Sequence, residues 1–204
     1  HELAMDEHAI GARGMAIHAV ESETVELAAR LAHEMADELP GFAVRIEHAS
    51  EASADTVNAV KRSGATVVTQ PGFIWSRGGR YVSAGSAIDE LYPLRSWLSS
   101  QVSVAYGSDA PYGAVSPLRA IQASMTRLSK SRQPVGGTQA IRASEALSLV
   151  TRIGDGTQRT LRPGEPADFV ALSENPITTS ADRIAEIQVI ATYVAGRKIW
   201  PPGD

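Results

Sequence analysis

The sequence contains no cysteine, which excludes disulfides, thiolate nucleophiles and cysteine-ligated zinc or iron–sulfur sites. Aromatic residues make up only 5% of its 204 positions, whereas hydrophobic residues make up 43%, so the core must be built from Ala, Val, Leu and Ile. An excess of basic residues is also missing, because 19 Lys and Arg stand against 23 Asp and Glu. This balance argues against nucleic-acid binding, which usually requires a basic face.

Long apolar runs are absent as well. None approaches the roughly 20 residues that are needed to cross a bilayer. The N-terminal segment mixes charges with Ala and Ile and does not resemble a secretory signal. We therefore expect a cytoplasmic protein with neither a membrane nor a nucleic-acid partner; association into a homo-oligomer stays open.

Strand-like and helix-like segments alternate along the first three quarters of the chain. Apolar runs at residues 14–20, 42–48, 65–70 and 102–106 predict strands, and the segments 22–39, 53–64, 91–100, 117–128 and 143–152 predict helices. Residues 73–86, rich in Gly, Ser and Arg, are expected to form a loop. This alternation predicts βαβ units with a parallel sheet. Four units equal half of a (β/α)₈ barrel, but a small doubly wound sheet fits the same pattern.

Both ends of the chain depart from this pattern. Residues 167–172 and 189–194 alternate like strands, residues 195–197 predict a hairpin turn, and residues 198–200 return along it. A helical apolar stripe over residues 3–12 begins almost at the first residue. We therefore interpret the chain as the C-terminal part of a longer polypeptide.

Three ionisable side chains stand at the ends of predicted strands: His18, His48 and Asp109. The ends of parallel strands face one side of the fold, where active sites are built. Imidazole and carboxylate groups are ligands for Zn²⁺ and similar ions, and a metal-bound water loses a proton near neutral pH. Each residue alone has a plain structural explanation, since Gly-Ser-Asp is also a common turn sequence. Together they predict metal-assisted hydrolysis.

The motifs around these residues resemble a known family. The segments occur in one order and spacing: Ala16-Ile17-His18-Ala19, Arg45-Ile46-Glu47-His48-Ala49, Gln70-Pro71 and Gly107-Ser108-Asp109-Ala110-Pro111. Residues 161–170 and 194–198 add a matching return strand and terminal hairpin. The chain thus resembles the amidohydrolase superfamily, in particular the amidohydrolase 3 group that includes N-acyl-amino-acid amidohydrolases.

The resemblance implies a fold and a domain division. Residues 1–160 would form the C-terminal half of a metal-dependent TIM barrel, strands five to eight, and residues 161–204 the C-terminal strands of a composite β-sandwich. The missing N-terminal half of the same polypeptide would then be a partner. The His-x-His of strand one and the bridging Lys or Glu of strand four do not occur in these residues.

The resemblance also implies a site and a reaction. The substrate of this reaction would be a small molecule with a carbon–nitrogen bond other than a peptide bond, such as an amide. One or two divalent ions, expected to be Zn with Fe, Mn and Co as alternatives, would be held by His18, His48 and Asp109. Asp109 would act as general base and then acid, with His48 assisting. We expect the substrate pocket to be lined by Gln70, Trp75 and Tyr112, and interpret Arg77 and Arg80 as solvated loop residues.

The sequence leaves one alternative function open and gives little support to another. Three ligands without the His-x-His pair would hold zinc weakly, which favours a non-catalytic fragment or degenerate relative that serves as a binding or regulatory module. A serine hydrolase has little support, because no Gly-x-Ser-x-Gly elbow is present and Ser108 has no recognisable histidine partner.

Overall fold

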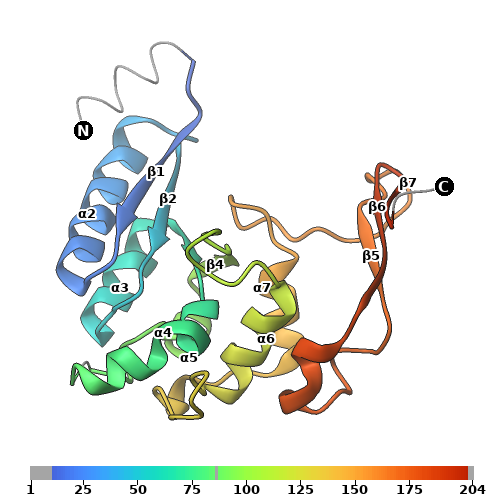
Figure 1. The fold of residues 1–204 in the computed structure, drawn as a ribbon. Coiled ribbons are helices and arrows are strands. Elements are labelled where there is room, and N and C mark those ends of the chain that lie inside the picture. Colours follow the sequence, from blue (N-terminus) through green and yellow to red (C-terminus); the bar gives the residue numbers. More distant parts are fainter. Residues whose placement is uncertain (1–10, 86, 202–204) are drawn as a thin grey trace.

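The computed structural model describes residues 11–85 and 87–201, so all but the last two positions of the helical stripe expected over residues 3–12 lie outside the described residues. The described chain forms a four-stranded parallel sheet and a separate three-stranded antiparallel sheet. Figure 1 shows the second sheet standing apart from the first, with helices between them. None of the helices in the described ranges is both long and apolar enough to span a membrane.

The parallel sheet confirms the predicted α/β alternation. Its strands are β1 (Gly14–Ala19), β2 (Ala43–His48), β3 (Thr66–Thr69) and β4 (Ser103–Tyr106), and they lie in the order β1-β2-β3-β4. Each pair is parallel, and the register places Ala19 opposite His48. Helical crossovers connect successive strands, as parallel pairing requires. The carboxyl ends of all four strands therefore lie at the same end of the sheet.

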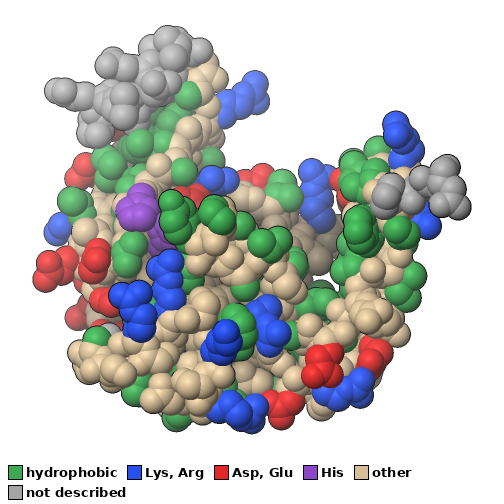
Figure 2. Space-filling view, viewed as in Figure 1, with side chains coloured by type: hydrophobic (Ala, Val, Ile, Leu, Met, Phe, Trp, Pro, Cys, Tyr) green, Lys and Arg blue, Asp and Glu red, His purple; other side chains and the backbone are tan. Residues whose placement is uncertain are grey.

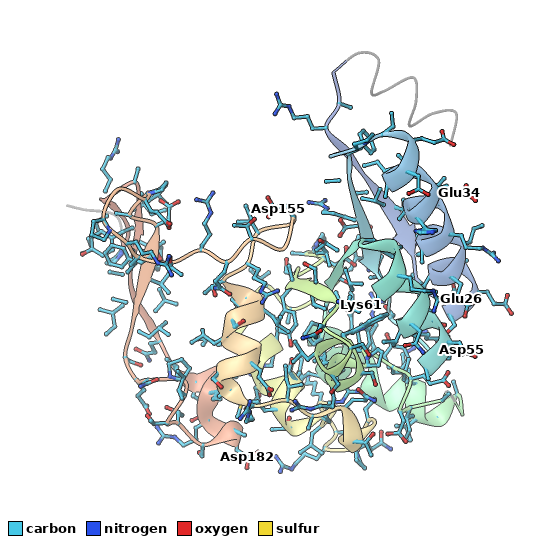
Figure 3. All side chains as sticks on the ribbon, turned by 180° about the vertical axis from the view of Figure 1, so that it is seen from behind. Glu26, Glu34, Asp55, Lys61, Asp155 and Asp182 are labelled. Atoms are coloured by element: carbon cyan, nitrogen blue, oxygen red, sulfur yellow. The ribbon has the colours of Figure 1, made fainter. Side chains whose placement is uncertain are left out.

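Two helices follow the first two strands and pack on the sheet. Helix α2 (Ser22–Glu38) buries a stripe of small and apolar side chains that includes Val25 and Met35. Helix α3 (Ala54–Ser63) begins at Ser53, whose side chain accepts a hydrogen bond from the Thr56 amide, and ends at the left-handed Gly64. The Thr56 hydroxyl donates to Glu26 at 2.7 Å and joins the two helices; Figure 3 labels Glu26, Glu34 and Asp55 on them.

The prediction of a loop over residues 73–86 is wrong, because helix α4 (Gly72–Ser83) occupies most of this segment. The helix buries Phe73 and Ile74 in a second apolar cluster with Leu91, Tyr92 and Val135. Gly78, which costs helix stability in isolation, lies against Val135 and Ser129 with no room for a side chain. Tertiary packing therefore decides the conformation of this glycine-rich segment.

The remaining helices support the strand ends. They are α5 (Leu94–Ser99), α6 (Pro117–Thr126), the short 3₁₀ segment η1 (Gly137–Gln139) and α7 (Ala143–Val150). Ser116 caps α6, because its side chain accepts a hydrogen bond from the Arg119 amide. Arg127 is 1% exposed, and its guanidinium donates to the carbonyls of Leu91 and Tyr92, which fixes the segment before α5.

The C-terminal strands also follow the prediction. They are β5 (Phe169–Leu172), β6 (Val189–Val194) and β7 (Arg197–Trp200), antiparallel in that order, with the 3₁₀ segment η2 (Ala181–Glu186) before β6. Many apolar side chains of this sheet are exposed, and Figure 2 shows several of them in green on that arm of the molecule. The exposed set is Phe169, Val170, Val189, Ile190, Val194, Ile199 and Trp200.

The two adjacent glycines of α4 provide a test of its packing. A Cβ at Gly78 would lie 2.7 Å from Val135 Cγ2, whereas one at Gly79 would meet the flexible end of Gln133. We expect Gly78→Ala to lower the free energy of unfolding by about 1–2 kcal/mol through overpacking. Gly79→Ala, with the same gain in helix propensity, is expected to be neutral or stabilising by about 0.5 kcal/mol. Urea denaturation of both variants measures the difference; equal effects would contradict this packing.

Glu145 provides a test of how α5 is tied to α7. Both its oxygens accept from Arg95 at 3.0 Å, and hydrogen bonding to Arg95 is the main cause that lowers the pKa of Glu145 from 4.5 to about 2. Because the folded pKa is lowered, the stabilisation is present above pH 4.5 and is lost as the pH falls toward 2.

We therefore expect Glu145→Gln to lower the free energy of unfolding by about 1–2 kcal/mol at pH 7. The difference from the wild type should shrink between pH 4.5 and 2 in urea titrations. The control is Arg142→Ala, because the Arg142 side chain, which also pairs with Glu145, is 78% exposed and should contribute little. A pH-independent effect of Glu145→Gln would refute this role of the ion pair.

Candidate functional site

Two histidines meet at the carboxyl ends of β1 and β2. His18 is the fifth residue of β1, and His48 is the last residue of β2, where the register places it opposite Ala19. Their ring centroids lie 4.6 Å apart with the planes at 73°, an edge-to-face contact. The strand ends therefore bring two predicted metal ligands together.

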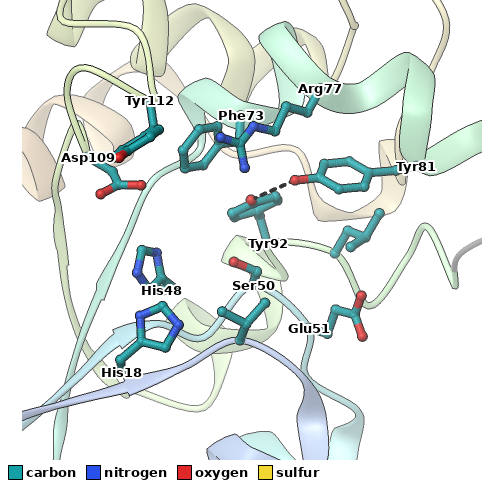
Figure 4. Close-up of a pocket in the computed structure, with 12 residues that line it drawn as sticks. His18, His48, Ser50, Glu51, Phe73, Arg77, Tyr81, Tyr92, Asp109 and Tyr112 are labelled. Carbon is teal, nitrogen blue, oxygen red and sulfur yellow. Dashed lines mark hydrogen bonds between the residues drawn. The ribbon is translucent and has the colours of Figure 1, made fainter.

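Asp109 lies in the loop that follows β4 and lines the same pocket as both histidines. This pocket has a volume of about 410 Å³, and Figure 4 shows the Asp109 carboxylate facing the two rings. Across residues 11–85 and 87–201, however, no group of three or more His, Cys, Asp or Glu side chains is close enough to hold a metal ion. The structure thus places the three residues around one pocket without closing a three-ligand site.

The backbone at these strand ends adopts an unusual conformation. His48, Ala49 and Asp109 have φ angles of 74°, 42° and 51°, in the left-handed region that residues other than glycine seldom occupy. The Ala49 amide nevertheless keeps a 2.9 Å hydrogen bond to the Ala19 carbonyl. Such strain persists only where the surrounding structure holds it, and it is common at functional sites.

The three expected substrate-binding residues are placed differently. Tyr112 lines the pocket and is 73% exposed. Gln70 is 4% exposed and does not line it; its Oε1 lies 2.8 Å from His48 Nδ1, and its Nε2 donates to the Val68 carbonyl at 3.0 Å. Trp75 also lies elsewhere on α4, because its ring is covered by Arg119 and Lys130 at 4.6 and 5.7 Å. The expected places of Gln70 and Trp75 in the pocket wall are therefore corrected.

One face of α4 supplies pocket residues that the sequence analysis did not predict, because it expected a loop over residues 73–86. Phe73, Arg77 and Tyr81 all line the pocket, and they stand at i, i+4 and i+8 of the helix. The Arg77 guanidinium lies 4.0 Å from the Phe73 ring centroid, and the Tyr81 hydroxyl lies 3.2 Å from that of Tyr92. The spacing of four residues was the available sequence signal, and it would have marked Arg77 as more than a solvated loop residue.

Glu51 places a second carboxylate in the pocket wall, apart from Asp109. Burial is the main cause that raises its pKa, followed by the charges of Glu21 and Glu90. Burial also raises the pKa of Tyr92 far above its usual value, so its hydroxyl stays protonated. In Figure 4, Glu51 and Arg77 lie on opposite sides of the pocket. The pocket therefore combines an acidic wall, a basic wall and two imidazoles.

Comparison with known proteins gives the family of the chain. The profile of the amidohydrolase family matches residues 6–199. An N-substituted formamide deformylase of Arthrobacter pascens is 28% identical over 162 residues, which are 75% of this chain and 30% of the relative. The protein LONG AFTER FAR-RED 3 of Arabidopsis thaliana is 26% identical over 77% of this chain and 28% of its own length.

Solved structures agree with this match. The crystal structure of an uncharacterized metal-dependent hydrolase from Pyrococcus furiosus is 27% identical, with a TM-score of 0.59 over 74% of this chain and 30% of that one. The chain thus spans less than a third of the length of the curated relatives it matches, which are covered to 30% and 28%. With nearly all of its residues matched by the family profile, the chain belongs to the amidohydrolase family.

Proposed function

We propose that this protein is a metal-dependent hydrolase that cleaves carbon–nitrogen bonds, other than peptide bonds, in small molecules such as amides. The observation that carries the proposal is the pair of histidines at neighbouring strand ends, with ring centroids 4.6 Å apart, in a pocket shared with Asp109. Membership of the amidohydrolase family supports it. The name of the deformylase relative, which refers to N-substituted formamides, supports an amide-like substrate.

The donor set fits a divalent metal ion. His18, His48 and Asp109 would supply imidazole and carboxylate ligands, which suit Zn and also Fe, Mn or Co. One or two such ions, when bound, would lower the pKa of a water molecule and polarise the substrate carbonyl. Since these three side chains do not form a closed ligand group in the described chain, further ligands would complete the site.

Asp109 is proposed to move the proton in this reaction. Its carboxylate would accept a proton from the attacking water and pass it to the departing nitrogen. The left-handed backbone at Asp109, with φ of 51°, would hold the carboxylate toward the histidines. Tyr112 and the α4 residues Phe73, Arg77 and Tyr81 line the same pocket and would contact the substrate.

We also propose that the further ligands come from an N-terminal half of a longer polypeptide. In this arrangement residues 1–160 are the C-terminal half of a TIM barrel and residues 161–204 part of a β-sandwich. Two observations support it: among the described strands β1 pairs only with β2, and the β5–β7 sheet exposes a row of apolar side chains. An open sheet edge and a large apolar face are both features that proteins normally cover.

Asp109→Asn tests the role of the carboxylate. We expect this change to lower kcat for amide hydrolysis by about 10²–10⁴-fold, because the base is lost while the shape of the side chain is retained. The measurement is the hydrolysis of N-substituted formamides by the protein in its natural, full-length form. The reaction is followed by the formate that it releases. A chelator should abolish the activity, and added Zn²⁺ should restore it.

The matched control is Asp182→Asn, because Asp182 is an exposed carboxylate on η2 (Figure 3) whose side chain is 70% exposed. This variant should keep full activity and metal content. Full activity of Asp109→Asn would refute the proposed proton transfer. A wild type that binds no metal and hydrolyses no amide would refute the hydrolase and favour the binding or regulatory module.

A further inference from the structure

Gln70 occupies a position that neither the pocket nor the sheet ladder explains. It follows β3, it is 4% exposed, and its side chain lies between two polar groups. Nε2 is 3.0 Å from the Val68 carbonyl oxygen, and Oε1 is 2.8 Å from His48 Nδ1. A buried amide with both ends in use has a fixed orientation.

The Val68 carbonyl determines which end of the amide faces His48. A carbonyl oxygen can only accept a hydrogen bond, so the NH₂ group of Gln70 must point toward Val68. The amide oxygen then faces the imidazole, and an amide oxygen also only accepts. His48 Nδ1 must therefore carry the proton of this hydrogen bond.

The neighbouring strand end holds the amide in place. The Gly107 amide donates to the Thr69 carbonyl at 2.9 Å, and a Cβ at Gly107 would lie 3.4 Å from Gln70 Nε2. The backbone that leads into Asp109 therefore runs beside the Gln70 amide. Gln70 thus links the strand end that carries His48 to the strand end that leads to Asp109.

We propose that Gln70 is a positioning residue that fixes His48 in its Nδ1–H tautomer and so reserves Nε2 for the metal ion. The role rests on the proposed function, because a reserved nitrogen matters only if the pocket holds a cation. In a neutral ring with Nδ1 protonated, Nε2 carries the lone pair and cannot donate to a substrate carbonyl. His48 is then a ligand and not a proton donor. Hydrogen bonding at the other ring nitrogen is how metal-binding imidazoles are oriented.

The tautomer of His48 can be measured without metal or substrate by ¹⁵N–¹H NMR of the imidazole nitrogens. We expect the neutral wild type to show Nδ1–H at His48. Gln70→Leu, which removes the acceptor at similar size, should lose this preference. Gln70→Glu keeps an oxygen facing Nδ1 and should retain it. The ring of His33, which is exposed on α2, should be unchanged in every variant.

Gln122→Leu is the matched control for a purely structural effect. Gln122 is also a buried glutamine, 9% exposed, whose Nε2 donates to the backbone carbonyls of Ala181 and Asp182. Its loss should lower stability as Gln70→Leu does, while leaving the His48 tautomer unchanged. In Zn²⁺ competition titrations, Gln70→Leu should weaken affinity by about 10–100-fold, whereas Gln122→Leu should not.

Two results would overturn the inference: Nε2–H at His48 in the wild type, or an unchanged tautomer in Gln70→Leu. The wild-type measurement decides the first even if the leucine variant does not fold. Failure of the hydrolase proposal is distinguishable, because a protein without amidase activity can still show the Gln70-dependent tautomer. Conversely, an active enzyme whose His48 tautomer ignores Gln70 would refute only the positioning role.

Discussion

The parallel register of β1 and β2 is the constraint on which the site depends. It places Ala19 opposite His48, so that the two imidazole rings meet with centroids 4.6 Å apart. A shift of one residue in either strand would turn one of the rings to the other face of the sheet. The buried side chains on both strands, such as Ile46 at 0% exposure, hold that register through core packing. Core stability and site geometry are therefore coupled at this strand pair.

Much of this arrangement could be predicted from sequence. The four strands and the helix caps at Ser53 and Ser116 have local signals, because strand runs and cap hydrogen bonds involve neighbouring residues. Helix α4 could not be recognised in this way, since two glycines argue against a helix and the cluster of Phe73, Ile74 and Val135 that outweighs them is formed by distant segments. Because a loop was expected in place of α4, Arg77 was not predicted to line the pocket.

Gln70 illustrates a second limit of sequence reasoning. The Gln70-Pro71 pair is part of the pattern that resembles the family, but a glutamine after a strand can face either a pocket or the interior. The Gln70 side chain faces the interior because the Val68 carbonyl and His48 Nδ1 lie on either side of its amide and hydrogen-bond to it. Trp75 shows the same ambiguity, because its cationic neighbours Arg119 and Lys130 come from later segments. Such choices depend on the packing of distant segments.

The two histidines are prepared unequally for a ligand. His48 is partly buried, has a backbone φ of 74° and is hydrogen-bonded through Nδ1, whereas His18 is exposed and has no hydrogen bond to any described residue. Metal binding would order the exposed His18 side chain and so cost rotamer entropy. The His48 ring is already ordered by its hydrogen bond, so this cost is smaller there. Metal affinity should therefore depend on whatever orients His18, because the structure already orients His48. A residue that accepts a hydrogen bond from the His18 ring would therefore be expected to raise metal affinity.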